Sequence, residues 1–151
     1  MTCFDTGFSV LFDIKTWESW TPILSLLVAI GALCTAYHQV QVGRNATATA
    51  LAHNIYQQYL VLCMENADLA SGQYRPSLNP DKRYAEYTWF FSNMLFAFEQ
   101  ILEAKPKDKK WKATIKSQLE KHKFHIQKSS TANSEHWFDD LSDLIKEVKE
   151  S

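Results

Sequence analysis

The sequence has few of the residues that interrupt secondary structure or that form cross-links. It contains four glycines and four prolines in 151 residues, which is too few for the many turns of a β-sandwich. Its three cysteines, Cys3, Cys34 and Cys63, are odd in number and widely spaced, and no two of them form a C-x-x-C pair. These counts argue against a disulfide framework.

Motifs that carry chemistry are also missing. The chain has no glycine-rich phosphate loop, no H-E-x-x-H, no G-x-S-x-G and no kinase signature, so the sequence indicates no catalytic residues and no cofactor. Its net charge of -1 creates no general attraction for nucleic acid. With 46% hydrophobic and 13% aromatic residues, however, the composition is that of a folded chain.

Charge is absent from one long stretch. No Asp, Glu, Lys or Arg occurs between Glu18 and Arg44. A helix from residue 21 to residue 37 would span about 26 Å, close to the bilayer hydrocarbon core of about 30 Å. The aromatic residues that flank it, as at a membrane interface, are Trp17, Trp20 and Tyr37. Pro22 falls where the first turn of such a helix tolerates proline.

The predicted organisation is therefore a lead-in over 1–20, which could lie in the membrane interface, a transmembrane helix over 21–40, and a soluble helical domain over 41–151. Two alternatives stay open: a cleaved signal peptide, and a buried helix of a soluble protein. The first 20 residues carry Asp5, Asp13 and Glu18 against Lys15, which is the wrong sign for a signal peptide. This acidic flank, with Arg44 after the segment, favours a cytoplasmic C-terminal domain.

Small residues recur within the apolar segment at spacings of four, three and four. They are Ser25, Ala29, Ala32 and Ala36. This spacing puts them on one helix face, where a second copy or a membrane protein partner could approach closely. The alternative is chance in an alanine-rich segment.

The rest of the chain has helical periodicity throughout, and the predicted fold class is all-α. A single N-terminal transmembrane helix continues into a long helix, to about Met64, of a small bundle of about four to five helices. A short helix follows from Asn66 to Gly72, a loop from Arg75 to Pro80, and a helix capped by Asp81 that ends near Ala104. A fourth helix is marked by Trp111, Ile115, Leu119 and His122. Asn133 or Ser134 is expected to cap the last one.

Two apolar stripes predict the core. The third helix carries Tyr84, Tyr87, Phe91, Met94, Phe98 and Ile101. The last helix carries Trp137, Phe138, Leu141, Leu144, Ile145 and Val148. Phe91, Met94 and Phe98 are expected to face the long helix or the last helix.

Charge is unevenly divided near the C-terminus. Residues 103–128 hold nine lysines and three acids, whereas residues 134–151 hold six acids and two lysines. One interpretation is that the two helices pack antiparallel with complementary edges. Another is that the lysine face contacts anionic headgroups through Lys109, Lys110, Lys112, Lys116, Lys121 and Lys123. Nucleic-acid binding is not favoured, because the patch has no Arg and no known motif.

The titratable residues do not form a recognisable site. His122 and His125 are three apart, and His53 and Glu99 could complete a metal site on paper, but no E-x-x-H pair occurs. We therefore expect solvent-facing histidines in a lysine-rich helix and no metal site. Glu99 is expected to be either partly buried, and then paired, or part of a solvated face.

The chain resembles a large group of uncharacterised bacterial proteins in which one N-terminal transmembrane helix runs directly into a small helical domain. The matching pieces are the apolar segment, Gln39-Val-Gln-Val-Gly-Arg-Asn-Ala-Thr-Ala-Thr, Glu65-Asn-Ala-Asp-Leu-Ala, Phe98-Glu-Gln-Ile-Leu, Trp111 and the late Trp137-Phe. The resemblance implies a bacterial inner-membrane setting and carries no activity. This chain departs from the pattern in its longer lead-in and lysine-rich fourth helix.

The leading functional hypothesis is a membrane-anchored helical interaction or scaffold module whose partners are the lipid bilayer and a protein bound through the transmembrane helix. Two alternatives come from other classes. One is a small membrane-bound enzyme or metal protein that uses the helical bundle. The other is a regulatory membrane protein that senses headgroups.

Overall fold

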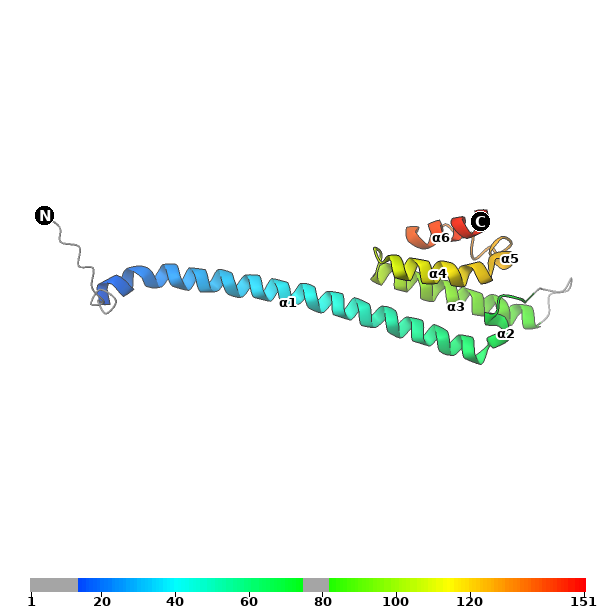
Figure 1. The fold of residues 1–151 in the computed structure, drawn as a ribbon, viewed down its shortest axis with the longest axis horizontal. Coiled ribbons are helices and arrows are strands. Elements are labelled where there is room, and N and C mark those ends of the chain that lie inside the picture. Colours follow the sequence, from blue (N-terminus) through cyan, green and yellow to red (C-terminus); the bar gives the residue numbers. More distant parts are fainter. Residues whose placement is uncertain (1–13, 75–81) are drawn as a thin grey trace. The chain divides into compact units, whose positions relative to one another are not determined.

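The computed structural model describes residues 14–74 and 82–151, which contain six helices and no strand (Figure 1). The helices are α1 (Ile14–Glu65), α2 (Ala67–Ala70), α3 (Lys82–Ala104), α4 (Lys109–Lys121), α5 (Lys123–Ile126) and α6 (Asp139–Glu150). The predicted all-α class, with a long N-terminal helix that continues into a small helical bundle, is confirmed. The predicted loop 75–80, its neighbour Asp81 and most of the lead-in lie outside the described residues.

The chain divides into two compact units, Met1–Asn45 and Ala46–Ser151, and α1 contributes to both. α1 is 52 residues long and ends at Glu65, close to the predicted end at Met64. It begins at Ile14, so Pro22 lies inside the helix, and the expectation that Pro22 occupies the first turn is wrong. Proline inside a helix removes one backbone hydrogen bond, and here the helix continues past it.

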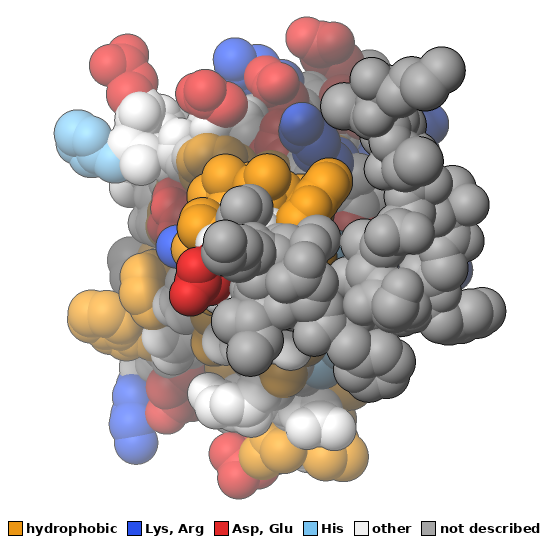
Figure 2. Space-filling model, turned by 90° about the vertical axis from the view of Figure 1, so that its left-hand side faces the viewer, with side chains coloured by type: hydrophobic (Ala, Val, Ile, Leu, Met, Phe, Trp, Pro, Cys, Tyr) orange, Lys and Arg blue, Asp and Glu red, His pale blue; other side chains and the backbone are white. Residues whose placement is uncertain are grey.

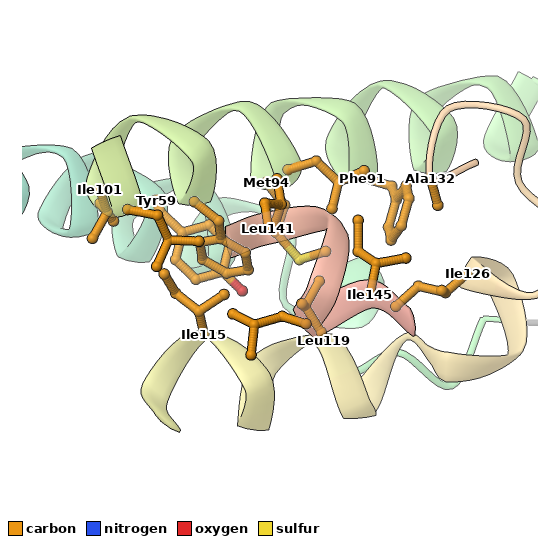
Figure 3. Close-up of a cluster of buried hydrophobic side chains, with 14 of the residues drawn as sticks. Tyr59, Phe91, Met94, Ile101, Ile115, Leu119, Ile126, Ala132, Leu141 and Ile145 are labelled. Atoms are coloured by element: carbon orange, nitrogen blue, oxygen red, sulfur yellow. The ribbon is translucent and has the colours of Figure 1, made fainter. Parts of the chain in front are cut away.

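α3 is the central helix of the second unit. Eight of its side chains are buried: Tyr87, Phe90, Phe91, Met94, Leu95, Phe98, Ile101 and Leu102. They meet Ile115 and Leu119 of α4 and the inward-facing side chains of α6, as Figure 3 shows for the labelled residues. Burying each large apolar side chain stabilises the fold by about 1.5–3 kcal/mol relative to leaving it in water.

The second half of α1 joins this core mainly through aromatic side chains. Tyr59 contacts Phe98 of α3 edge to face, with ring centres 5.0 Å apart, and Tyr56 contacts Trp111 of α4 at 5.3 Å. Ala52 and Ile55 are buried on the same helix face. The expectation that Phe98 faces the long helix is therefore confirmed.

α4 and α6 run in the same direction, so the predicted antiparallel arrangement is wrong (Figure 1). Lys112 pairs with Asp140 at 2.9 Å and Lys116 pairs with Glu147 at 2.8 Å, so residue numbers rise together along both helices. α5 and the turns over 127–138 return the chain to the level where α4 begins. The opposite charges still meet, and because water screens such exposed pairs they add little to the stability of the fold.

Gly72 closes the turn after α2 with a left-handed backbone, φ +70°. A Cβ atom built on Gly72 would lie 2.0 Å from the carbonyl oxygen of Lys121. Glycine is therefore needed both for its conformation and for the close approach of this turn to the end of α4.

We predict that Gly72→Ala lowers the free energy of unfolding of the second unit by about 2 kcal/mol or more, because the new methyl group meets backbone that cannot easily move. Urea unfolding in mild detergent, followed by tryptophan fluorescence, measures this change.

Gly43→Ala is the matched control, since a Cβ at Gly43 has no described atom within 4 Å. Its unfolding midpoint should equal that of the wild type or exceed it slightly. Equal midpoints for Gly72→Ala and the wild type would contradict the prediction.

Candidate functional site

Among the residues that the structure describes, the most exposed apolar surface is the first part of α1. From Trp20 onward, α1 is long and apolar enough to cross a membrane, on the grounds of its length and composition. Its exposed large side chains are Trp20, Ile23, Leu24, Leu26, Leu27, Val28, Ile30, Leu33, Tyr37, Val40 and Val42. Exposed apolar patches of this extent are typical of surfaces that meet lipid or another protein.

The four small residues of this segment are all exposed and lie in unbroken helix. The Ser25 hydroxyl donates to the carbonyl oxygen of Pro22 at 2.9 Å, and the Thr35 hydroxyl donates to that of Ala32 at 2.8 Å. Both hydroxyl donors are thus satisfied within the helix, which removes the main cost of placing them in hydrocarbon. The face formed by Ser25, Ala29, Ala32 and Ala36 is therefore free of unsatisfied polar donors.

The six lysines singled out for headgroup contact occupy different settings. Lys112 and Lys116 pair with acids of α6, and the hydrogen bond to Glu147 raises the pKa of Lys116. Lys121 donates to the side-chain oxygen of Gln118 at 3.0 Å. The remaining three are Lys109, Lys110 and Lys123. One face of the molecule, in Figure 2, accordingly shows acidic and basic side chains interspersed.

The expectation of solvent-facing histidines is wrong for His122 and His125, which are 1% and 7% exposed. The Nδ1 atom of His122 lies 2.9 Å from the hydroxyl oxygen of Tyr87. The His125 ring packs edge to face on Tyr87 and Phe91, with ring centres 4.8 and 4.7 Å apart. Both histidines are buried because α4 and α5 turn their apolar faces onto α3.

This environment disfavours the charged form of both rings. Burial, with smaller contributions from the charges of His125 and Lys121, lowers the pKa of His122 to about 4. Burial also lowers the pKa of His125. The Nε2 atom of His122 is buried and has no hydrogen-bond partner among the described residues. A protonated His122 would therefore place poorly compensated charge among aromatic rings.

Glu99 is partly buried, and its carboxylate is paired. Its Oε1 atom accepts a hydrogen bond from the backbone N–H of Phe138 at 2.9 Å. Phe138 is the residue that precedes α6, so the predicted caps Asn133 and Ser134 are wrong. Trp137 precedes α6 as well, and its indole N–H donates to the carbonyl oxygen of Thr131 at 2.7 Å.

The residues considered together for a metal site are not brought together. His53 packs against Trp111 with ring centres 5.3 Å apart, Glu99 binds the start of α6, and the two buried histidines contact α3. Across residues 14–74 and 82–151, no group of three or more His, Cys, Asp or Glu side chains is placed to hold a metal ion.

A hollow of about 240 Å³ lies between α1 and α3 on the surface of the second unit. Its lining residues are all uncharged: Ile55, Gln58, Tyr59, Leu62, Asn93, Phe96, Ala97 and Gln100. Phe96 and the neighbouring Trp89 are 58% and 73% exposed on the outer face of α3. Aromatic side chains of this kind are enriched where proteins bind one another.

Comparison of the chain with protein-family models, with curated proteins and with solved structures gave no match.

We predict that the second unit loses stability as the pH falls from about 6.5 to about 4. In this window the unfolded chain, with ordinary histidines, binds protons before the folded chain does. The contribution of His122 to the free energy of unfolding is greatest above pH 6.5, and it stops falling below pH 4. Because the pKa of His122 is about 4 in the folded chain and 6.5 in the unfolded chain, His122 accounts for a loss of about 3 kcal/mol in the free energy of unfolding across this window. Urea unfolding at a series of pH values measures it.

His122→Leu should flatten this pH dependence while it lowers the stability at pH 7 by about 1–2 kcal/mol, because the contact with Tyr87 is lost. His136→Gln, at an exposed histidine, is the control and should leave the slope unchanged. A His122→Leu protein with the wild-type slope would show that His122 is not the titrating group.

Proposed function

We propose that this chain is a membrane-anchored helical interaction module. In this proposal the first part of α1 crosses the bilayer, and the second unit is held at the aqueous surface. The observation that carries the proposal is the exposed, uncharged apolar surface of α1 between Glu18 and Arg44. Hydrocarbon covers such a surface at no electrostatic cost, since a helix satisfies its own backbone groups.

The proposed setting is the bacterial inner membrane with the second unit in the cytoplasm. The acidic residues before the segment and Arg44 after it support this orientation, because positively charged flanks stay on the cytoplasmic side. The bacterial setting rests on the resemblance to single-helix membrane proteins with a small helical domain.

The proposed activity is binding rather than catalysis. Within the membrane, the face formed by Ser25, Ala29, Ala32 and Ala36 allows a partner helix, or a second copy of α1, to approach closely. Outside it, the uncharged hollow between α1 and α3 offers a surface for apolar side chains of a partner. These two surfaces support a scaffold or accessory role.

If α1 crosses a membrane, the full chain will stay in the membrane pellet after alkaline carbonate extraction. The double variant Leu27→Arg with Val28→Arg should be released, because each Arg at the centre of a spanning helix costs about 2.5–3.5 kcal/mol.

Leu60→Arg with Val61→Arg is the matched control, since these residues are also apolar and exposed but belong to the second unit. It should remain in the pellet. Release of the wild-type chain by carbonate would overturn the proposed anchor.

A protein partner, or a second copy of the chain, is expected to co-purify with the full chain in mild detergent. Ala32→Ile with Ala36→Ile should reduce this association severalfold, because larger side chains hold the helices apart. Leu33→Ile changes an adjacent exposed position at constant volume and should preserve it. A chain that runs as a monomer without a partner at every detergent concentration would refute this part of the proposal.

A further inference from the structure

The most basic segment of the second unit consists of the turn that joins α3 to α4 and the first residues of α4. Residues 105–112 read Lys-Pro-Lys-Asp-Lys-Lys-Trp-Lys, with five lysines and one acid. Backbone hydrogen bonds fix the turn, since Lys105 N–H donates to the carbonyl oxygen of Ile101 and Asp108 N–H to that of Lys105. The lysines are therefore held on a defined surface.

This turn lies at the end of the second unit where the chain enters it. Trp111 contacts His53 and Tyr56 of α1, each with ring centres 5.3 Å apart. At its other end, α4 brings Lys121 against Gly72, beyond the end of α1. The start of α4 is thus near Ala46, where the unit begins, and its end is at the opposite pole.

The distances along α1 are short. His53 is seven residues after Ala46, which is a rise of about 10 Å along a helix. Val42, the last apolar residue before Arg44, is four residues before Ala46, a rise of about 6 Å. The pole of the second unit that carries these lysines is therefore the pole from which the chain continues into the apolar segment.

The acid within the turn is already engaged. Asp108 caps α4, and its Oδ1 atom accepts from the backbone N–H groups of Lys110 and Trp111 at 2.9 and 3.4 Å. Lys112 is paired with Asp140. The structure gives the other four lysines no ion pair with any described residue, and three of them are exposed: Lys107, Lys109 and Lys110.

Two further carboxylates lie near this end of the unit. Glu103 is exposed in the last turn of α3, and Asp139 is exposed beside Asp140 at the start of α6. With the capping Asp108 and the paired Asp140, four carboxylates stand near the five lysines, so the surplus at this end of the unit is one positive charge. Contact of a few well-placed ammonium groups with anionic headgroups requires only such a local surplus.

We propose that Lys107, Lys109 and Lys110, with Lys105 beside them, form a juxtamembrane contact for the headgroups of anionic phospholipids. This inference rests on the proposed membrane anchor and adds the lipid class that the soluble unit recognises. It narrows the predicted lysine face to the first two residues of α4 and the turn before them, because Lys112 and Lys116 are neutralised by α6 and Lys121 lies at the far pole.

Lysine footprinting of the full chain tests the contact. The protein is placed in nanodiscs of phosphatidylcholine alone or of phosphatidylcholine mixed with phosphatidylglycerol, and the rate of amine acetylation is measured at each lysine by mass spectrometry. In the anionic discs, the acetylation rates of Lys107, Lys109 and Lys110 should fall to about one third or lower of their rates in phosphatidylcholine, because their ammonium groups are held at the charged surface. High salt should restore the rates.

Lys121 and Lys123 are internal controls at the far pole, and their rates should be equal in the two lipids. Replacing Lys107, Lys109 and Lys110 by Gln should also abolish the protection of Lys105, whereas replacing Lys121 and Lys123 by Gln should preserve it. Equal rates in both lipids for the lysines of the turn, or equal slowing of all lysines, would overturn the inference.

The experiment separates this inference from the anchor. A chain that does not enter nanodiscs of either composition contradicts the proposed anchor itself. A chain that enters both and shows no dependence on lipid charge contradicts only the headgroup contact.

Discussion

The free-energy cost of leaving one helical surface in water constrains the setting in which this chain can exist. Apolar surface in water costs about 25 cal/mol per Å², and the first part of α1 exposes large apolar side chains around most of its circumference, outside the face of Ser25, Ala29, Ala32 and Ala36. Charge is absent from this part, and the hydroxyls of Ser25 and Thr35 bond to carbonyl groups of the same helix. Each of these properties suits a helix surrounded by hydrocarbon, which is the cover that we propose.

After Asn45, α1 is partly buried by other helices of the second unit. Only one face of α1 is buried there, by Ala52, Ile55 and Tyr59, and that face packs on α3 and α4 largely through aromatic rings. The second unit therefore has its own core centred on α3, to which α1 supplies one wall. α1 is thus one unbroken helix that contributes residues both to the segment of the proposed anchor and to this wall.

Periodicity was sufficient to predict the helices, their order and most of the core, because Phe91, Met94 and Phe98 repeat at helical spacing and burial follows that spacing. The direction of α6 was not predictable, since it depends on turns over 127–138 that have no strong local signal. The buried histidines were also missed. His122 continues the apolar row of Ile115 and Leu119, and this spacing indicates burial. The lysines around His122 in the sequence, however, favour a solvent-exposed position. Its partner, Tyr87, is 35 residues away in the sequence.

The carboxylate of Glu99 takes the place of a local cap for α6, because it accepts from an N–H group 39 residues further along the chain. A helix of 12 residues is marginal in isolation, and no side chain among the described residues caps it from within its own turn. Formation of α6 therefore waits for α3 to fold, which couples the end of the chain to its middle. Because α6 in turn buries Leu141, Leu144, Ile145 and Val148 in the core centred on α3, the two helices are expected to open together rather than one at a time.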